Sequence, residues 1–182
     1  MAIKFIKYLF IACISNSCLA EENPLVQAYL DNDYEAFASH YEKVIDKNET
    51  TLSGGSPFSF LIYSFLVDDP RFFNLVIQHA DPNHTDRPGL TAIFEVVRKC
   101  DIERAKKLVE KGAKVNHRNT KGSTVLHWVA ESKCYDLAKY LIESGGDAYT
   151  SDNDGITPLD IAKSKKDKHM IESMQNSKAA LQ

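Results

Sequence analysis

The chain has 182 residues, of which 43% are hydrophobic and 26% charged, and its formal net charge at pH 7 is −3. Nucleic-acid-binding proteins need clustered Lys and Arg to neutralise phosphates, so a slightly acidic chain without a basic stripe is not typical of that class. The length is sufficient for one folded domain with its own hydrophobic core.

The first twenty residues, MAIKFIKYLFIACISNSCLA, have the order of charges and apolar residues found in export signals. Lys4 and Lys7 precede an apolar run at 8–14, and small or polar residues lead to Ala20. This order predicts a secretory signal peptide over residues 1–20. The apolar run is shorter than the roughly 20 residues that a membrane-spanning helix needs.

Two alternatives to cleavage after residue 20 stay open. The segment could remain as an uncleaved anchor, or Cys13 or Cys18 could carry a lipid, although neither cysteine follows the usual Leu-small-small pattern. Cleavage would remove two lysines and no acidic residue, leaving 20 basic and 25 acidic residues. We therefore expect an exported, acidic mature protein.

Helical patterns follow the signal. Residues 23–45 contain two of them, separated by Asp31-Asn32-Asp33, and residues 54–65 (GGSPFSFLIYSF) begin with a turn and continue as an apolar helix. A further helix is predicted over 69–80 (DPRFFNLVIQHA), and the last one over about 167–174.

Between these segments a motif recurs with a period of 33 residues, which indicates a repeat architecture. The period relates Gly89, Gly122 and Gly155; the threonines two residues later, Thr91, Thr124 and Thr157; and the apolar residues Ile93, Leu126 and Leu159. Each threonine can cap a short inner helix. An outer helix with helical apolar spacing follows and ends at a glycine.

These segments resemble the ankyrin repeat, with its Gly-x-Thr-Pro-Leu-His-x-Ala opening and Gly-Ala-Asp-x-Asn close. Residues 122–127 lack only the proline of the opening, residues 155–160 keep the proline but replace the histidine, and residues 112–116 carry the close. Residues 80–83 carry the close less completely, while Asp86, Asn119 and Asp152 stand where the family has a turn aspartate.

The resemblance implies an all-α ankyrin-repeat solenoid of about five helix-turn-helix units with short β-hairpin loops. Residues 21–53 would form a degenerate N-terminal capping repeat, residues 54–175 the repeats with a C-terminal cap, and residues 176–182 a tail. End repeats are expected to depart from the pattern because one of their faces meets water.

In this family the hairpin tips and the exposed side of the inner helices bind proteins. The resemblance therefore implies these partner-binding candidates: Arg87, Glu95, Arg98, His117, Arg118, Lys121, Trp128, Glu131, Asp152 and Asp154. Trp128 is the only tryptophan; it is either a binding anchor or a side chain packed against the neighbouring inner helix. Charges graded from Arg118 and Lys121 to Asp154 could orient a partner.

Cys100 and Cys134 lie 11 and 12 residues after their repeat glycines, in the predicted turn between inner and outer helix. Neighbouring helices pack about 8 to 10 Å apart, whereas a disulfide needs Cα atoms within about 7 Å. Either a disulfide between the two repeats or two partly buried thiols fits the sequence.

Nothing in the sequence indicates catalysis. It has no Gly-x-Ser-x-Gly, no His-Glu-x-x-His and no glycine-rich phosphate loop, and its six histidines lack metal-ligand spacing. We expect a binding protein that is not an enzyme and has neither a metal nor a cofactor.

Asn83 begins a glycosylation sequon but is expected to act within its own repeat, which favours a bacterial periplasm over a eukaryotic secretory route. Exported bacterial proteins of this size with a few ankyrin repeats resemble immunity proteins that guard against type VI secretion toxins of the lipase or phospholipase class. The resemblance implies a periplasmic protein that blocks the active site of one toxic effector. The alternative is a general periplasmic ankyrin scaffold, such as those linked to oxidative-stress defence.

Overall fold

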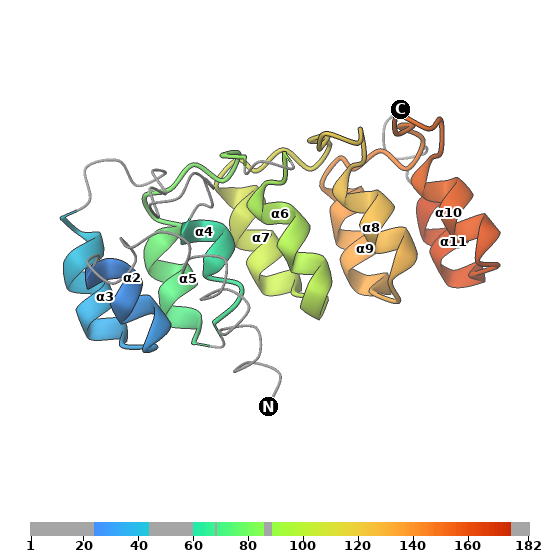
Figure 1. Cartoon of the computed structure of the whole chain (residues 1–182). Coiled ribbons are helices and arrows are strands. Elements are labelled where there is room, and N and C mark those ends of the chain that lie inside the picture. Colours follow the sequence, from blue (N-terminus) through green and yellow to red (C-terminus); the bar gives the residue numbers. More distant parts are fainter. Residues whose placement is uncertain (1–23, 44–59, 68, 86–88, 176–182) are drawn as a thin grey trace. The chain divides into compact units, whose positions relative to one another are not determined.

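A computed structural model describes residues 24–43, 60–67, 69–85 and 89–175. These residues form helices and loops without any strand, so the all-α class predicted from the sequence is confirmed. The chain divides into two compact units, Met1–Asp81 and Pro82–Gln182, which are described in turn (Figure 1). The predicted signal peptide, the predicted tail and the predicted turn at the start of residues 54–65 lie outside the described residues.

The first unit contains four described helices: α2 (Pro24–Leu30), α3 (Tyr34–Tyr41), α4 (Phe60–Tyr63) and α5 (Pro70–Val76). Helix α2 packs against α3, and α5 packs against both α3 and α4. The break between α2 and α3 falls at residues 31–33, as the sequence predicts.

Aromatic side chains fill the core of the first unit. The Phe37 ring lies 4.9 Å from Phe72, 5.6 Å from Tyr41 and 5.7 Å from Phe60, measured between ring centroids. Phe37, Tyr41 and Phe72 are almost completely buried. Aromatic pairs at these separations contribute stability beyond the area that they bury.

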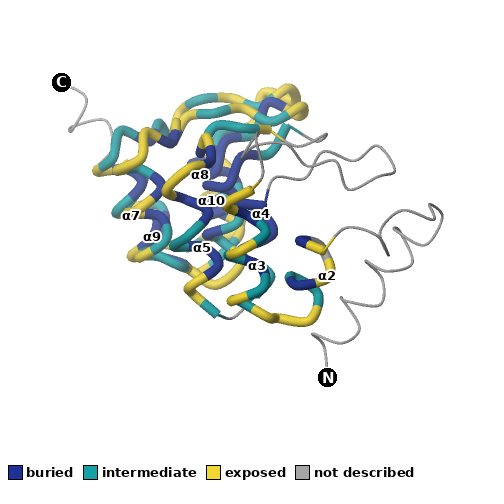
Figure 2. Tube along the Cα trace, turned by 90° about the vertical axis from the view of Figure 1, so that its left-hand side faces the viewer, coloured by how far each residue is buried: buried dark blue, intermediate teal, exposed yellow. Residues whose placement is uncertain are grey.

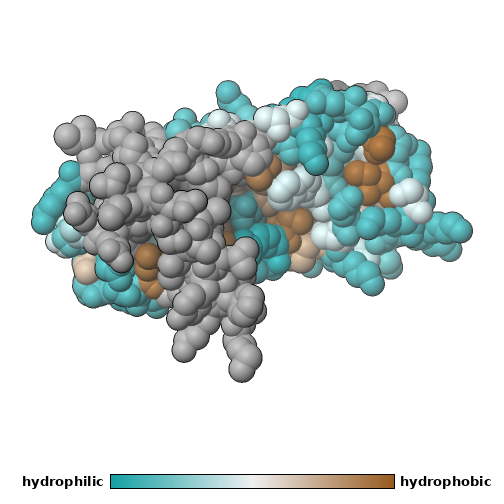
Figure 3. Space-filling model, in the orientation of Figure 1, coloured by the Kyte–Doolittle hydropathy of each residue, from teal (hydrophilic) through white to brown (hydrophobic). Residues whose placement is uncertain are grey.

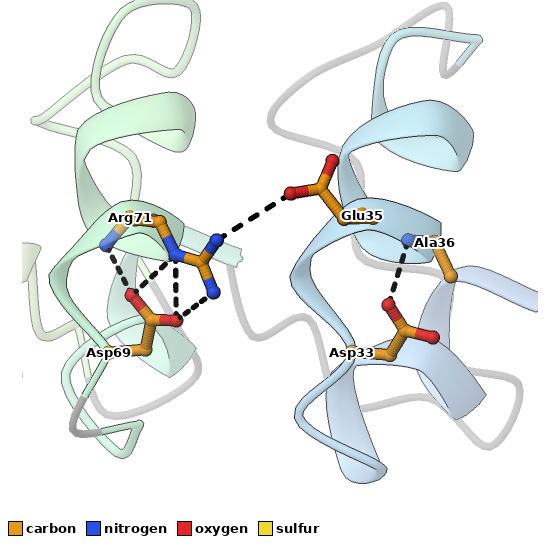
Figure 4. A network of polar contacts seen from close by, with 5 residues as sticks. All are labelled: Asp33, Glu35, Ala36, Asp69 and Arg71. Atoms are coloured by element: carbon orange, nitrogen blue, oxygen red, sulfur yellow. Dashed lines mark hydrogen bonds and ion pairs between the residues drawn. The ribbon is translucent and has the colours of Figure 1, made fainter.

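An exposed polar network connects α3 with α5 in the same unit (Figure 4). The Arg71 guanidinium donates to Asp69 at 2.8 Å and approaches the Glu35 carboxylate at 3.5 Å. These hydrogen bonds from Arg71 hold the pKa of Asp69 below its ordinary value. Exposed ion pairs of this kind contribute little to stability, so the aromatic core is the main attraction within this unit.

The second unit contains three pairs of helical segments. The inner helices are α6 (Ala92–Glu95), which continues into the 3₁₀ helix η2 (Val96–Lys99), α8 (Val125–Glu131) and α10 (Pro158–Ser164). The outer helices are α7 (Ile102–Glu110), α9 (Tyr135–Glu143) and α11 (Lys168–Gln175). Inner helix packs on inner helix, as in α8 with α10, and outer on outer, as in α9 with α11.

Burial follows this two-layer arrangement. Leu126, Leu137 and Leu141 are fully buried, and Figure 2 shows buried stretches along the helices with exposed stretches in the connecting loops. One repeat alone could not bury these side chains, because its apolar face is covered by the next repeat.

The second helix of each pair begins in a recurring way. An aspartate side chain accepts a hydrogen bond from a backbone N–H of the first turn at α3 and α5 of the first unit and at α7 and α11 of the second; these aspartates are Asp33, Asp69, Asp101 and Asp167. Such a cap contributes about 1 kcal/mol. At α9 the corresponding residue is Cys134, which makes no side-chain cap hydrogen bond.

In the structure Cys134 is bonded to Cys100 in the preceding repeat, with their Cα atoms 5.2 Å apart. Cys134 is buried, whereas Cys100 is an exposed residue with a left-handed backbone conformation, φ 50°. The bond joins corresponding turns of two successive repeats, so a covalent link takes the place of the missing helix cap.

Candidate partner-binding surface

Successive repeats of the second unit are joined by asparagine side chains. Asn116 accepts a hydrogen bond from the backbone N–H of Asp147 at 2.8 Å and donates to the carbonyl of Gly145 at 2.7 Å. One repeat earlier, Asn83 accepts from the N–H of Lys114 at 2.8 Å and donates to the carbonyl of Gly112 at 2.9 Å. These bonds fix the position of each loop relative to its neighbour.

The two hairpin tips at 119–123 and 152–156 are internally hydrogen bonded. Asn119 Oδ1 accepts from the N–H groups of Lys121 and Ser123 at 2.9 and 3.0 Å, and the Asn119 N–H donates to the Ser123 carbonyl. Asp152 arranges its own tip in the same way. The tips therefore close as the predicted hairpins do, although no strand is formed in the described part of the chain.

The tips are also stacked on each other. Asn153 donates from its backbone N–H to the carbonyl of Lys121 at 3.0 Å and from its side chain to the carbonyl of Thr120 at 3.1 Å. Gly122 makes this approach feasible: it has φ 75°, and a Cβ there would lie 2.9 Å from the Asn153 nitrogen. A pair of tips held in this way is preorganised, which lowers the entropy cost of binding a partner.

His127 has a structural role. Its Nδ1 accepts from the Thr124 N–H at 2.9 Å, and its Nε2 lies 3.1 Å from the carbonyl of Ile156 in the next repeat. The neutral ring with a proton on Nε2 satisfies both contacts. Burial lowers the pKa of His127, which favours this neutral form.

The candidate residues on the tips fall into two groups. Arg118, Lys121 and Asp154 are exposed and available to a partner. His117 and Asp152 have partners within the fold: His117 Nε2 lies 2.9 Å from the carbonyl of Gly89, and Asp152 organises its tip as described above. Arg87 lies outside the described residues.

On the inner helices, the partly buried Trp128 ring packs edge-on against Phe94 of the neighbouring helix, 5.1 Å between centroids. Phe94 also contacts the His117 ring at 6.4 Å, so the tip and the inner-helix face share one aromatic cluster. Glu95 forms an ion pair with Arg98 at 3.4 Å, and Glu131 is exposed.

Two apolar side chains outside the predicted partner-binding set are exposed on or close to the tips. Tyr149 is 39% exposed and Ile156 is 44% exposed. Tyr149 stands 33 residues after Asn116, at the position of an inter-repeat asparagine. This departure from the repeat pattern is the feature of the sequence that could have indicated an exposed Tyr149. In Figure 3 apolar residues reach the surface between hydrophilic ones over the part of the second unit around α6 and α8.

The described residues hold no group of three or more His, Cys, Asp or Glu side chains arranged to bind a metal ion. Among the same residues, no helix has both the length and the apolar character needed to cross a membrane.

Comparison with protein families gives a match to the model "Ankyrin repeats (3 copies)" over residues 61–153, which is a little over half of the chain. No curated protein matches the chain. The matched segment contains helices α5 to α9, the inter-repeat asparagines Asn83 and Asn116, and the first tip at 119–123; α10 and α11 follow it in the chain. The chain belongs to the ankyrin-repeat family, and its repeats form a protein-protein interaction module.

Proposed function

We propose that this protein is an exported immunity protein, which binds one toxic effector enzyme and blocks its active site. A lipase or phospholipase is the favoured class of effector. The proposal adds a compartment, a partner class and a mode of action to the interaction module already described.

The stacked tips carry the binding part of the proposal. They present Arg118, Lys121 and Asp154 to solvent from a loop pair whose backbone is fixed by hydrogen bonds to Asn119, Asp152 and Asn153. A rigid pair of loops beside a partly buried tryptophan suits insertion into a pre-formed concave site, as an enzyme's active-site entrance is. Enzyme–inhibitor interfaces commonly use such preorganised loops.

The disulfide supports export. Disulfides persist in oxidising compartments such as the bacterial periplasm and are rare in the cytosol. The bond between Cys100 and Cys134 therefore agrees with the signal peptide predicted over residues 1–20. Together they favour a periplasmic location.

Affinity capture tests the proposal. The chain beginning at Glu21, tagged at its C-terminus, is recovered from the periplasm of its host, and the proteins that elute are identified by mass spectrometry. The proposal predicts one stoichiometric partner that has hydrolase activity. This activity should fall when the purified tagged chain is added to the partner. Loss of this protein should also be lethal to cells exposed to sister cells that carry the partner.

Several weak, substoichiometric partners would instead favour a general periplasmic scaffold. A stoichiometric partner whose enzyme activity is unchanged by binding would exclude inhibition while leaving the interaction module intact.

A further inference from the structure

The turn between α10 and α11 is unusually rich in lysine. Residues 163–168 read Lys-Ser-Lys-Lys-Asp-Lys, and all four lysines are exposed; we call this segment the lysine turn. Its one carboxylate, Asp167, accepts hydrogen bonds from the Met170 N–H at 3.1 Å and from the Tyr135 hydroxyl at 3.0 Å. The acid is thus committed to the fold.

Two of these lysines stand where local structure favours other residues. Lys166 has φ 57°, a left-handed conformation that glycine or asparagine adopts more readily. Lys168 is the first residue of α11, where the helix dipole favours a negative side chain over a positive one. Fold stability therefore does not account for either lysine.

The surroundings extend the patch. Lys133 is exposed in the corresponding turn of the preceding repeat, and the Tyr135 ring lies 5.6 Å from the His169 ring beside it. The exposed acidic residues Glu131, Asp136 and Glu172 lie within four residues of Lys133 or Lys168 in the sequence. Within the lysine turn itself, positive side chains outnumber the single engaged aspartate.

The last repeat is consequently dipolar. Its tip end carries four aspartates, at positions 147, 152, 154 and 160, whereas the opposite end of α10 carries the four lysines. A negatively charged surface would attract the lysine turn and repel the aspartate-rich tip of the last repeat. Such a surface would hold that tip pointing away from it, where it remains free to bind.

We propose that the lysine turn binds the anionic phospholipid headgroups of a membrane surface. Lysines are compact, strongly hydrated charges on flexible stems, and they suit a diffuse negative surface better than a specific carboxylate, which arginine forks recognise. A cluster of four or more such charges is enough to attract a protein to anionic lipid. Binding through charge alone is peripheral and weakens with salt. This inference does not depend on the effector.

Vesicle co-sedimentation tests the proposal with the chain beginning at Glu21, because the apolar run of residues 8–14 would itself bind lipid. Vesicles containing phosphatidylglycerol should sediment the protein at low salt, and purely phosphatidylcholine vesicles should not. The variant Lys165→Gln/Lys166→Gln/Lys168→Gln should bind the anionic vesicles on the order of 100-fold more weakly, at roughly fivefold per lysine.

A matched control removes the same number of charges elsewhere. Lys107→Gln/Lys111→Gln/Lys114→Gln changes three exposed lysines on α7 and the loop that follows it, and it should bind anionic vesicles within about twofold of the parent, as three charges distant from the contact contribute little. Circular dichroism of both variants checks that the helices are intact. Failure of the parent chain to sediment with anionic vesicles, or equal losses in the two variants, would overturn the proposal. So would binding to polyglutamate without binding to vesicles, since that result indicates an acidic protein partner.

Discussion

The two units of the molecule are stabilised in different ways. In the first, the described helices meet through aromatic rings centred on Phe37. In the second, hydrogen bonds from Asn83, Asn116 and Asn153 recur from repeat to repeat, and a disulfide is added to them. Packing between aromatic rings does not fix where the connecting loops lie, whereas hydrogen bonds from side chains to the loop backbone hold each loop in one position. The second unit is therefore the better platform for binding.

The largest effect is expected from Phe37→Ala, which removes the ring that Tyr41, Phe60 and Phe72 surround. A cavity of this size costs about 4 kcal/mol in the free energy of unfolding. The urea midpoint, monitored by helical circular dichroism, should fall accordingly. Because Phe73 is a second buried phenylalanine of the same unit, with a centroid 5.2 Å from Phe65, Phe73→Leu serves as the milder comparison. An unchanged midpoint for Phe37→Ala would refute the aromatic account.

Loss of the disulfide is expected to cost slightly less. Cys100→Ser/Cys134→Ser opens a link between residues 34 apart in sequence, which by chain entropy amounts to about 3.5 kcal/mol of unfolding free energy. Urea unfolding of the parent in reductant should reproduce the shift.

A second version of this variant sharpens the comparison. Cys100→Ser/Cys134→Asp restores the aspartate cap seen at Asp33, Asp69, Asp101 and Asp167, and it should recover about 1 kcal/mol relative to the double serine variant. No difference between the two variants would show that α9 does not need a cap at this position.

Asn116→Ala tests the hydrogen bonds between repeats and is expected to cost about 1 to 2 kcal/mol of unfolding free energy for two lost bonds. Hydrogen exchange provides a local readout, because the backbone N–H of Asp147 donates to Asn116 and should exchange faster in the variant. Ser151→Ala, at an exposed position, is the control. Unaltered protection of Asp147 would mean that the asparagine does not hold the loop.

Much of the second unit could be predicted from the sequence, because the repeats impose a period on it. The 33-residue spacing of Gly89, Gly122 and Gly155 predicts the three inner helices, which begin directly after Thr91, Thr124 and Thr157. Thr157 accepts the predicted cap hydrogen bond, whereas Thr91 makes no side-chain cap hydrogen bond. Local signals sufficed here because each contact within a repeat joins residues close in the chain.

The features that could not be predicted from the sequence depend on distances between residues of different repeats. The cysteine pair could not be decided from helix spacing alone, since a one-residue offset determines whether the turns approach within bonding range. His117 and Asp152 are predicted partner contacts, and the sequence alone does not reveal the hydrogen bonds that they also make to Gly89 and within the second tip. The net charge of the chain is negative and does not reveal the local cluster of positive charge in the lysine turn.

The most direct test of the account compares the two units in one binding experiment. The captured partner is titrated calorimetrically with the parent chain, with Arg118→Ala/Trp128→Ala in the second unit, and with Glu35→Ala/Arg71→Ala in the first. Circular dichroism of each variant checks that its fold is intact. The single variant Arg118→Ala keeps the contact between Trp128 and Phe94, so its binding can be measured without any destabilisation that loss of this contact would cause. The account predicts a loss of at least about 2 kcal/mol in binding free energy for the second-unit variant and no change for the first-unit variant. Unchanged affinity of the second-unit variant would contradict the claim that the tips and inner helices of that unit bind the partner.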